Sequence, residues 1–143
     1  MSTNDILIEG RYFCKIASKT VKLKGLVRYP AAPASKIPVT PDEHTNCAIS
    51  DVFFELGVRN NWHIHSSNQI LIVKERICYY QEEGQPVRKL SVGEVINILP
   101  GIRHWHGASP DDKMVHLAIN INSEKGTVNW LEPVTDEQYA GKA

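Results

Sequence analysis

The sequence is organised around one histidine-rich segment, Trp62-His63-Ile64-His65-Ser66-Ser67-Asn68-Gln69. A second segment of the same kind follows later in the chain, Pro100-Gly101-Ile102-Arg103-His104-Trp105-His106-Gly107. In a β-strand alternate side chains share one face, so His63 and His65 point the same way, with their backbones roughly 7 Å apart. Two imidazoles at that spacing can bind one metal ion with bonds of about 2.1 Å. Because His104 and His106 repeat the arrangement, we expect a barrel that holds the two segments against each other.

Length and composition indicate one domain. A chain of 143 residues is long enough to bury a core without disulfides or structural metal. Lys+Arg and Asp+Glu both total 16, so the charge balance does not suggest a nucleic-acid or membrane partner. Residues 1–5 lack the start of a signal peptide, and no window is apolar enough to span a bilayer. Cys14, Cys47 and Cys78 lack zinc-site or redox spacing, which is typical of free thiols. We expect a soluble cytoplasmic protein with a small-molecule substrate.

The middle of the chain, residues 47–121, has the pattern of many short strands. Alternating or strand-rich runs are separated by glycine and proline turns. Such close spacing predicts an all-β sandwich or barrel and not alternating strands and helices. The expected strands are 47–56, 60–65, 69–74, 77–81, 87–90, 94–99, 103–107 and 114–121.

The flanking regions are less regular. Residues 1–20 show no clear pattern, whereas 21–29 alternate as one half-buried strand with an irregularity at Gly25. Residues 30–46 contain four prolines, which predict a long loop that acts as a lid, a mobile excursion or an arm to a partner subunit. Residues 134–139 read Val-Thr-Asp-Glu-Gln-Tyr, which predicts a helix start capped by Thr or Asp.

Strand periodicity places further side chains on the face of the histidines. If Gln69 faces inward it joins them, and Leu71 and Val73 line the same cavity. On the strand 114–121, His116 and Asn120 share one face. Five of the six histidines therefore lie on strands that can face one interior.

Two motifs carry a resemblance to a known family. The patterns Gly57-x5-His63-x-His65-x3-Gln69 and Gly93 through Gly101-x2-His104 resemble the paired signatures of the cupin superfamily. The resemblance covers residues 47–121. It implies an all-β, single-domain cupin, a double-stranded β-helix or jelly-roll barrel. The expected divisions are an N-terminal strand and proline-rich loop (1–46), a core barrel (47–121) and a tail with a short helix (122–143).

The resemblance also implies a metal site. Its ligands here are His63, His65, Gln69 and His104, although Gln69 stands where the family usually has glutamate. A neutral amide oxygen still binds a divalent ion but leaves its full positive charge, which weakens affinity and strengthens the Lewis acid. The alternative is that Gln69 only hydrogen-bonds a ligand. The sequence also departs from the family at three turn positions, Arg76, Pro100 and Ala108.

A narrower resemblance extends to the end of the chain. The phrases that carry it are Trp62-His63-x-His65, Gln69-Ile70-Leu71-Ile72-Val73, His104-Trp105-His106-Gly107-Ala108, His116-Leu117-Ala118-Ile119, Val128-Asn129-Trp130 and Val134-Thr135-Asp136-Glu137-Gln138-Tyr139. They resemble small bacterial cupins that include manganese-dependent hydroxynitrile lyases and relatives of the carboxymuconolactone-decarboxylase-associated cupins. Imidazole with an amide oxygen suits Mn, Fe, Co, Ni or Zn, and the resemblance favours manganese or iron. It also implies a homodimer.

Other side chains have expected roles near the metal. We assign His106 and His116 to proton transfer. The structural alternative for His106 is packing in the barrel wall. The alternative for His116 is a buried histidine that hydrogen-bonds to the backbone. Trp62 and Trp105 are expected in the core or an interface, and the cysteines to be inert. The residues expected to contact substrate are Ser50, Val52, Phe54, Leu71 and Asn120.

Three functions are compatible with this site. The first is a metal-dependent lyase or isomerase that acts on a small oxygenated molecule, as in hydroxynitrile cleavage. The second is an Fe-dependent dioxygenase, which differs by its requirement for oxygen. The third is a cupin that binds a small ligand without catalysis, because fold does not dictate function.

Overall fold

The computed structural model describes residues 21–23, 26–28, 33–125 and 128–142. Nearly all of the regular structure is β. The elements in chain order are β1 (Val21–Leu23), β2 (Leu26–Arg28), β3 (Ala34–Val39), β4 (Cys47–Phe54), β5 (His63–His65), β6 (Gln69–Glu75), β7 (Cys78–Glu82), β8 (Arg88–Leu90), β9 (Val95–Ile98), β10 (His104–Ala108), β11 (Met114–Ile121), a 3₁₀ turn (Ser123–Lys125), β12 (Val128–Trp130) and α1 (Asp136–Tyr139).

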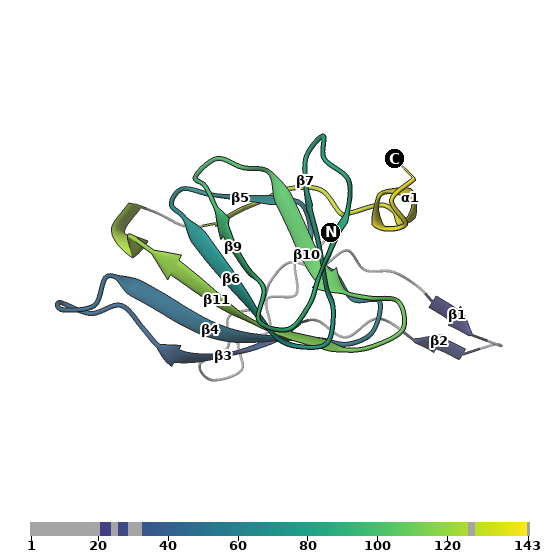
Figure 1. Cartoon of the computed structure of the whole chain (residues 1–143), viewed down its shortest axis with the longest axis horizontal. Helices are drawn as coiled ribbons and strands as arrows, with labels where there is room; N and C mark the ends of the chain where they lie inside the picture. The colour runs from purple at the N-terminus through teal and green to yellow at the C-terminus, as the bar shows by residue number, and fades with distance from the viewer. Residues whose placement is uncertain (1–20, 24–25, 29–32, 126–127, 143) are drawn as a thin grey trace.

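Two five-stranded antiparallel sheets build the barrel (Figure 1). One has the order β12-β5-β10-β7-β8 and the other β3-β4-β11-β6-β9. The strands that carry the histidines are thus β5 and β10 in one sheet and β11 in the other. The all-β prediction is confirmed. Within the described ranges, no helix has the length and apolar character needed to cross a membrane.

The core lies between the two sheets and follows the two-residue period of the strands. One sheet contributes buried Leu71 and Val73 from β6, and the other contributes buried Cys78 and Tyr80 from β7. Burial of large apolar side chains of this kind stabilises the fold by about 1.5–3 kcal/mol each. Alternate burial is clearest on β6 and β9.

The cysteines agree with the expectation of inert thiols where the structure describes them. Cys47 and Cys78 are free. Burial raises the pKa of the Cys78 thiol to about 12, so it stays protonated and unreactive. Cys14 lies outside the described residues.

The N-terminal third departs from the prediction in two places. Residues 21–29 are not one strand: β1 and β2 pair antiparallel with each other, Leu23 opposite Leu26. Gly25 lies between them in the sequence, outside the described residues. Residues 30–46 are not only loop, because β3 pairs with β4 at the edge of its sheet. Pro38 is tolerated there, since an edge strand leaves one side of its backbone unpaired and the β3 register shifts between Lys36 and Val39.

Strand β5 and the C-terminal tail also differ from the prediction. The strand expected at 60–65 begins only at His63, and β12, which the sequence pattern did not predict, pairs with it. Three residues are too few to show a periodic pattern, so β12 can be identified only from its pairing with β5.

One departure from the family pattern has a visible consequence. Arg76 takes a φ of 63°, the left-handed conformation that the usual glycine adopts without strain.

The C-terminal helix is short but capped as predicted. The Thr135 hydroxyl accepts from the backbone N–H of Gln138, and the Gln138 side chain accepts from the Thr135 N–H, which is a capping box. The helix lies over a second apolar cluster of Trp62, Trp105 and Val134. This confirms that the two tryptophans are core residues.

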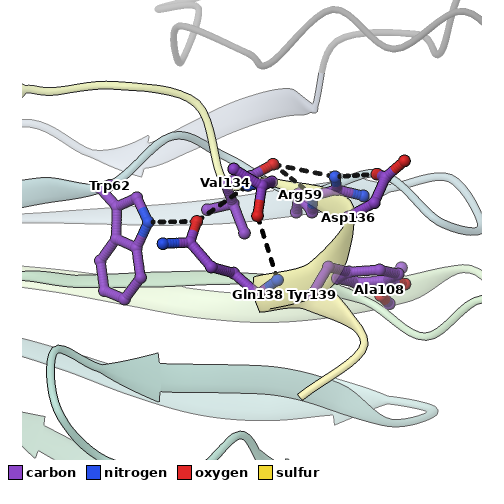
Figure 2. A network of polar contacts seen from close by, with 8 residues as sticks. Arg59, Trp62, Ala108, Val134, Asp136, Gln138 and Tyr139 are labelled. Atoms are coloured by element: carbon purple, nitrogen blue, oxygen red, sulfur yellow. Dashed lines mark hydrogen bonds and ion pairs between the residues drawn. The ribbon is translucent and has the colours of Figure 1, made fainter. Parts of the chain in front are cut away.

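Polar contacts fasten this helix to the barrel (Figure 2). The Trp62 indole N–H donates to Gln138 Oε1 at 3.2 Å, and the Tyr139 hydroxyl donates to the Ala108 carbonyl at 2.7 Å. The buried Arg59 guanidinium donates to the Val134 carbonyl and to an Asp136 carboxylate oxygen, each at 2.9 Å. The guanidinium also lies 4.4 Å from the centre of the Tyr139 ring. The tail is therefore an integral part of the barrel wall that carries His63, His104 and His106.

Candidate metal centre

Five histidines meet between the sheets, as their spacing predicts. His63 and His104 are directly opposite each other on β5 and β10, and both are buried. His106 and His116 are buried as well, and His65 is half-buried. Trp62 and Trp105 point into the other cluster, so the alternation of β5 and β10 holds on both faces.

The rings pack closely. The ring centres of His63 and His104 are 4.2 Å apart, and His65 lies 5.2 Å from His63 and 5.6 Å from His104. His106 lies 5.3 Å from His63. One ring nitrogen from each of His63, His104 and His106 lies within 4.8 Å of the other two. Geometry alone therefore offers two candidates for the third histidine ligand beside His63 and His104, namely His65 and His106.

Hydrogen bonds fix the orientation of two rings. His63 Nδ1 lies 2.8 Å from the Asn61 carbonyl, and His104 Nδ1 lies 2.9 Å from the Ile102 carbonyl. A carbonyl oxygen only accepts, so both rings carry their proton on Nδ1 and present the Nε2 lone pair. A carbonyl behind the ring is the arrangement that orients metal-binding histidines.

Gln69 is held in a similar way. Its side-chain N–H₂ donates to Asn120 Oδ1 at 3.0 Å, which leaves the Gln69 Oε1 atom free to accept. The Gln69 side chain also acts on the pKa of His65, so the two side chains are neighbours. Asn120, expected to contact substrate, thus orients Gln69.

The chemistry of the donor set fits a transition-metal cation. Within the described residues, His65 Nε2, Gln69 Oε1 and His104 Nε2 are buried and have no hydrogen-bond partner. A buried polar atom without a partner costs about 1–3 kcal/mol. A cation that accepts these lone pairs removes that cost, and imidazole with an amide oxygen suits Mn, Fe, Co, Ni or Zn.

His106 and His116 form a separate buried pair. His116 Nε2 lies 2.9 Å from His106 Nδ1, so one proton is shared between the two nitrogens. The Phe54 ring lies against both, with centres 5.9 Å from His106 and 5.4 Å from His116. His106 thus has a partner for Nδ1, unlike the orphaned Nε2 atoms of His65 and His104.

The fold and this geometry can be compared with known proteins. No family model matches the chain. The chain is 44% identical over 90 residues to an (R)-mandelonitrile lyase from Granulicella tundricola, in a match that covers 63% of this chain and 69% of that protein. The crystal structure of a cupin-like protein from Thermotoga maritima matches with a TM-score of 0.72 at 44% identity, covering 76% of this chain and 82% of that chain. The chain belongs to the cupin family.

More distant cupins share only the architecture. A cupin-2 domain from Rhodospirillum rubrum has a TM-score of 0.62 at 12% identity, covering 87% of this chain and 79% of that chain. The predicted cupin barrel is therefore confirmed, and the buried histidines lie between its two sheets.

The residues expected to contact substrate have varied surroundings in this cupin. Phe54 and Leu71 are buried in the main core, and Val52 packs against it. Ser50 is half-buried and lies opposite Ala118 in the register of β4 and β11. Contact with a substrate stays a prediction for all five.

Sequence reasoning missed two polar groups beside the histidines. Asn60 is buried and contacts His106. Tyr80 is buried on β7 with its ring centre 6.0 Å from His104, and its hydroxyl donates to Glu82 at 2.8 Å. The pairing of β7 with β10 places Tyr80 there, and the bridge between Arg59 and Gly107 places Asn60 beside His106. No motif in the sequence indicates either pairing.

Burial keeps the cupin's central histidines neutral. It is the largest cause that lowers the pKa of His65, His104 and His116 to about 4. Burial also holds the pKa of His63 well below its ordinary value, helped by His104, and that of His106, helped by His116. Neutral imidazole is the form that binds a metal or accepts a proton.

These shifts predict acid destabilisation of the metal-free protein. In the unfolded chain His65, His104 and His116 become protonated near pH 6.5, whereas in the folded chain they stay neutral down to about pH 4. The free energy of unfolding should therefore fall as the pH drops from 6.5 towards 4, by up to about 1.4 kcal/mol per pH unit for each histidine. Above pH 6.5 this contribution should be constant.

Urea unfolding of the metal-free protein at a series of pH values measures that slope. His116→Gln removes one of the three groups and should make the slope shallower. A free energy of unfolding that is flat between pH 6.5 and 4.5 would contradict the prediction.

Proposed function

We propose that this cupin binds a divalent transition metal, Mn²⁺ or Fe²⁺ by preference, through His63, His65, Gln69 and His104. The observation that supports the proposal is the set of unpartnered buried atoms on His65, Gln69 and His104. The neighbouring Nε2 of His63 completes four ligands, because its Nδ1 is bound behind the ring. When bound, the cation supplies a Lewis acid that lowers the pKa of a substrate hydroxyl, and the neutral amide of Gln69 leaves its charge undiminished.

We propose further that the reaction is the reversible cleavage of a small hydroxynitrile. The 44% identical relative is a mandelonitrile lyase, which supports this substrate class over other oxygenated molecules. In that reaction the hydroxyl loses its proton, the carbon–cyanide bond breaks with its electron pair on cyanide, and a carbonyl forms. Cyanide then takes a proton to leave as hydrogen cyanide, so the chain needs a base that also returns a proton.

His106 is suited to be that base. Its Nδ1 faces His116 at 2.9 Å, so Nε2 is the nitrogen left to take the hydroxyl proton. Its lowered pKa keeps the ring neutral at neutral pH, so a nitrogen lone pair is present to accept the proton. As His106 Nε2 gains a proton, Nδ1 can pass one to His116 Nε2, which spreads the charge over two buried rings. The same pair returns the proton to cyanide.

Turnover of mandelonitrile tests the function. Metal-depleted protein reloaded with Mn²⁺ should release benzaldehyde at the same rate in air and under argon, and should stop when a chelator is added. A matched His104→Ala protein should be inactive under all conditions. Oxygen consumption with Fe²⁺ would indicate the dioxygenase instead, and mandelonitrile-induced stabilisation without product would indicate a ligand-binding cupin.

The homodimer stays a prediction. Long apolar side chains exposed on the described surface include Phe53, Leu56 and Val95, but they do not by themselves indicate a second copy.

A further inference from the structure

The segment before β5 contains a bulge. His63 is opposite His104, and Arg59 is opposite Gly107. Between these two bridges lie three residues on one side (60–62) and two on the other (105–106). One extra residue on one strand is a β-bulge, a feature that re-aims side chains near active sites. The extra residue here lies directly before the first histidine of the metal centre.

Asn60, the first residue of the bulge, contacts His106 in three ways. The backbone N–H of Asn60 donates to the His106 carbonyl at 3.1 Å, and the His106 N–H donates to Asn60 Oδ1 at 2.9 Å. The side-chain amide thus replaces the backbone acceptor that the bulge displaces. The Asn60 side chain is buried, so no water competes for these bonds.

The third contact is with the ring of His106. Asn60 Nδ2 lies 3.2 Å from Nδ1 and 3.1 Å from Nε2. A donor aligned with one lone pair would be much further from the other nitrogen. Nearly equal distances therefore place the amide over the face of the ring, as in an N–H···π contact. Such a contact restricts the ring's rotation and leaves both of its nitrogens available.

The next residue, Asn61, orients the proposed metal ligand His63. The Asn61 carbonyl accepts from His63 Nδ1, as described above, so consecutive bulge residues hold His106 and His63. The C-terminal tail clamps the bulge from outside: Trp62 exchanges backbone hydrogen bonds with Leu131 and Glu132. Figure 2 shows the flanking Arg59 and Trp62 tied to the α1 region.

We propose that Asn60 is a positioning residue that sets the ring of His106 for proton transfer. This inference rests on the proposed role of His106, but the geometry that it concerns is independent of any substrate. Asn60 does not touch the metal ligands His63, His65 or His104 in the contacts above, so its effect should be confined to His106.

Asn60→Asp tests the proposal in the full chain. The aspartate keeps an acceptor for the His106 N–H but replaces the amide N–H₂ over the ring with an oxygen. We expect kcat for mandelonitrile to fall by about 10–100-fold with KM and Mn²⁺ affinity within a few-fold. Asn60→Ala, which introduces no charge, should act in the same direction. Asn129→Asp makes the same chemical change at an exposed position of β12 and should have no effect.

A spectroscopic readout separates this inference from the function. Protein loaded with diamagnetic Zn²⁺ is examined by ¹H–¹⁵N correlation of the histidine rings. Wild type should give distinct Nδ1 and Nε2 resonances for His106, and the Asn60 variants should give averaged or broadened ones. Unchanged His106 resonances in both variants would overturn the proposal, and so would loss of Zn²⁺ binding in both. If wild type does not turn over mandelonitrile, the proposed function fails and the ring resonances still decide the role of Asn60.

Discussion

His65→Ala should impair metal binding, whereas His106→Ala should impair proton transfer and leave metal binding nearly unchanged. We expect His65→Ala to weaken Mn²⁺ binding by at least about 100-fold, because it removes a ligand whose Nε2 has no other partner. His106→Ala should leave Mn²⁺ affinity within a few-fold, because His106 Nδ1 is engaged by His116. It should lower kcat by about 10²–10⁴-fold, the usual contribution of a general base. Calorimetric titration of the metal-depleted variants with Mn²⁺ measures the first effect, and mandelonitrile turnover the second.

This pair of variants also separates two possible centres. His106, His63 and His104 each have one nitrogen within 4.8 Å of the other two, so this group can also hold a metal ion. If His106→Ala loses the metal while His65→Ala keeps it, the centre is that group, and His106 cannot be the base. His104 belongs to both arrangements, so His104→Ala should lose Mn²⁺ binding in either case. This variant is therefore the reference for complete loss of binding.

Gly107→Ala should destabilise the barrel severely. A Cβ at this position would lie 2.6 Å from both the Arg59 Cβ and the Val58 carbonyl oxygen. Neither neighbour can withdraw, because Ala108 N–H donates to that carbonyl at 2.9 Å and Arg59 is tied to the C-terminal tail. We expect the free energy of unfolding to fall by about 3 kcal/mol or more, a large part of the stability of a typical domain. Urea unfolding monitored by tryptophan fluorescence measures it.

Gly101→Ala is the matched control for that substitution. A Cβ there meets no atom within 4 Å, but the residue has a φ of +80°. The cost should therefore be only the conformational one, about 1 kcal/mol. Equal losses in the two variants would show that the contact with Arg59 and Val58 is not the cause.

The central strands and the clustering of the histidines were largely predictable from the sequence. Strands β6 and β9 bury alternate residues, and β9 also alternates exposed Val95 and Asn97 with buried Ile96 and Ile98. The same period correctly places His63 with His65 and His104 with His106 on the inner face. The short helix followed from the Thr135 cap, a local signal that does not depend on the rest of the fold.

The errors have one cause. Strands β1, β2, β3 and β12 have three to six residues each, and their pairing partners decide whether they form. The prolines of residues 30–46 predict a loop because proline is excluded from a central strand, but β3 lies at an edge, where proline is tolerated. Position at an edge is a property of the whole sheet.

The sequence by itself therefore determined which side chains share a face, because strand periodicity is local and survives any arrangement of the strands. It also supplied the proposed donors, three histidines and a glutamine. Only the tertiary structure decided that Asn60 lies over the ring of His106, that His116 pairs with it, and that Gly107 faces Arg59. The contacts of Asn60 and Gly107 join segments far apart in the chain through a bulge and its register, and the contact of His106 with His116 joins β10 in one sheet to β11 in the other. All of them depend on how the strands pair and pack and not on the residues within any one strand.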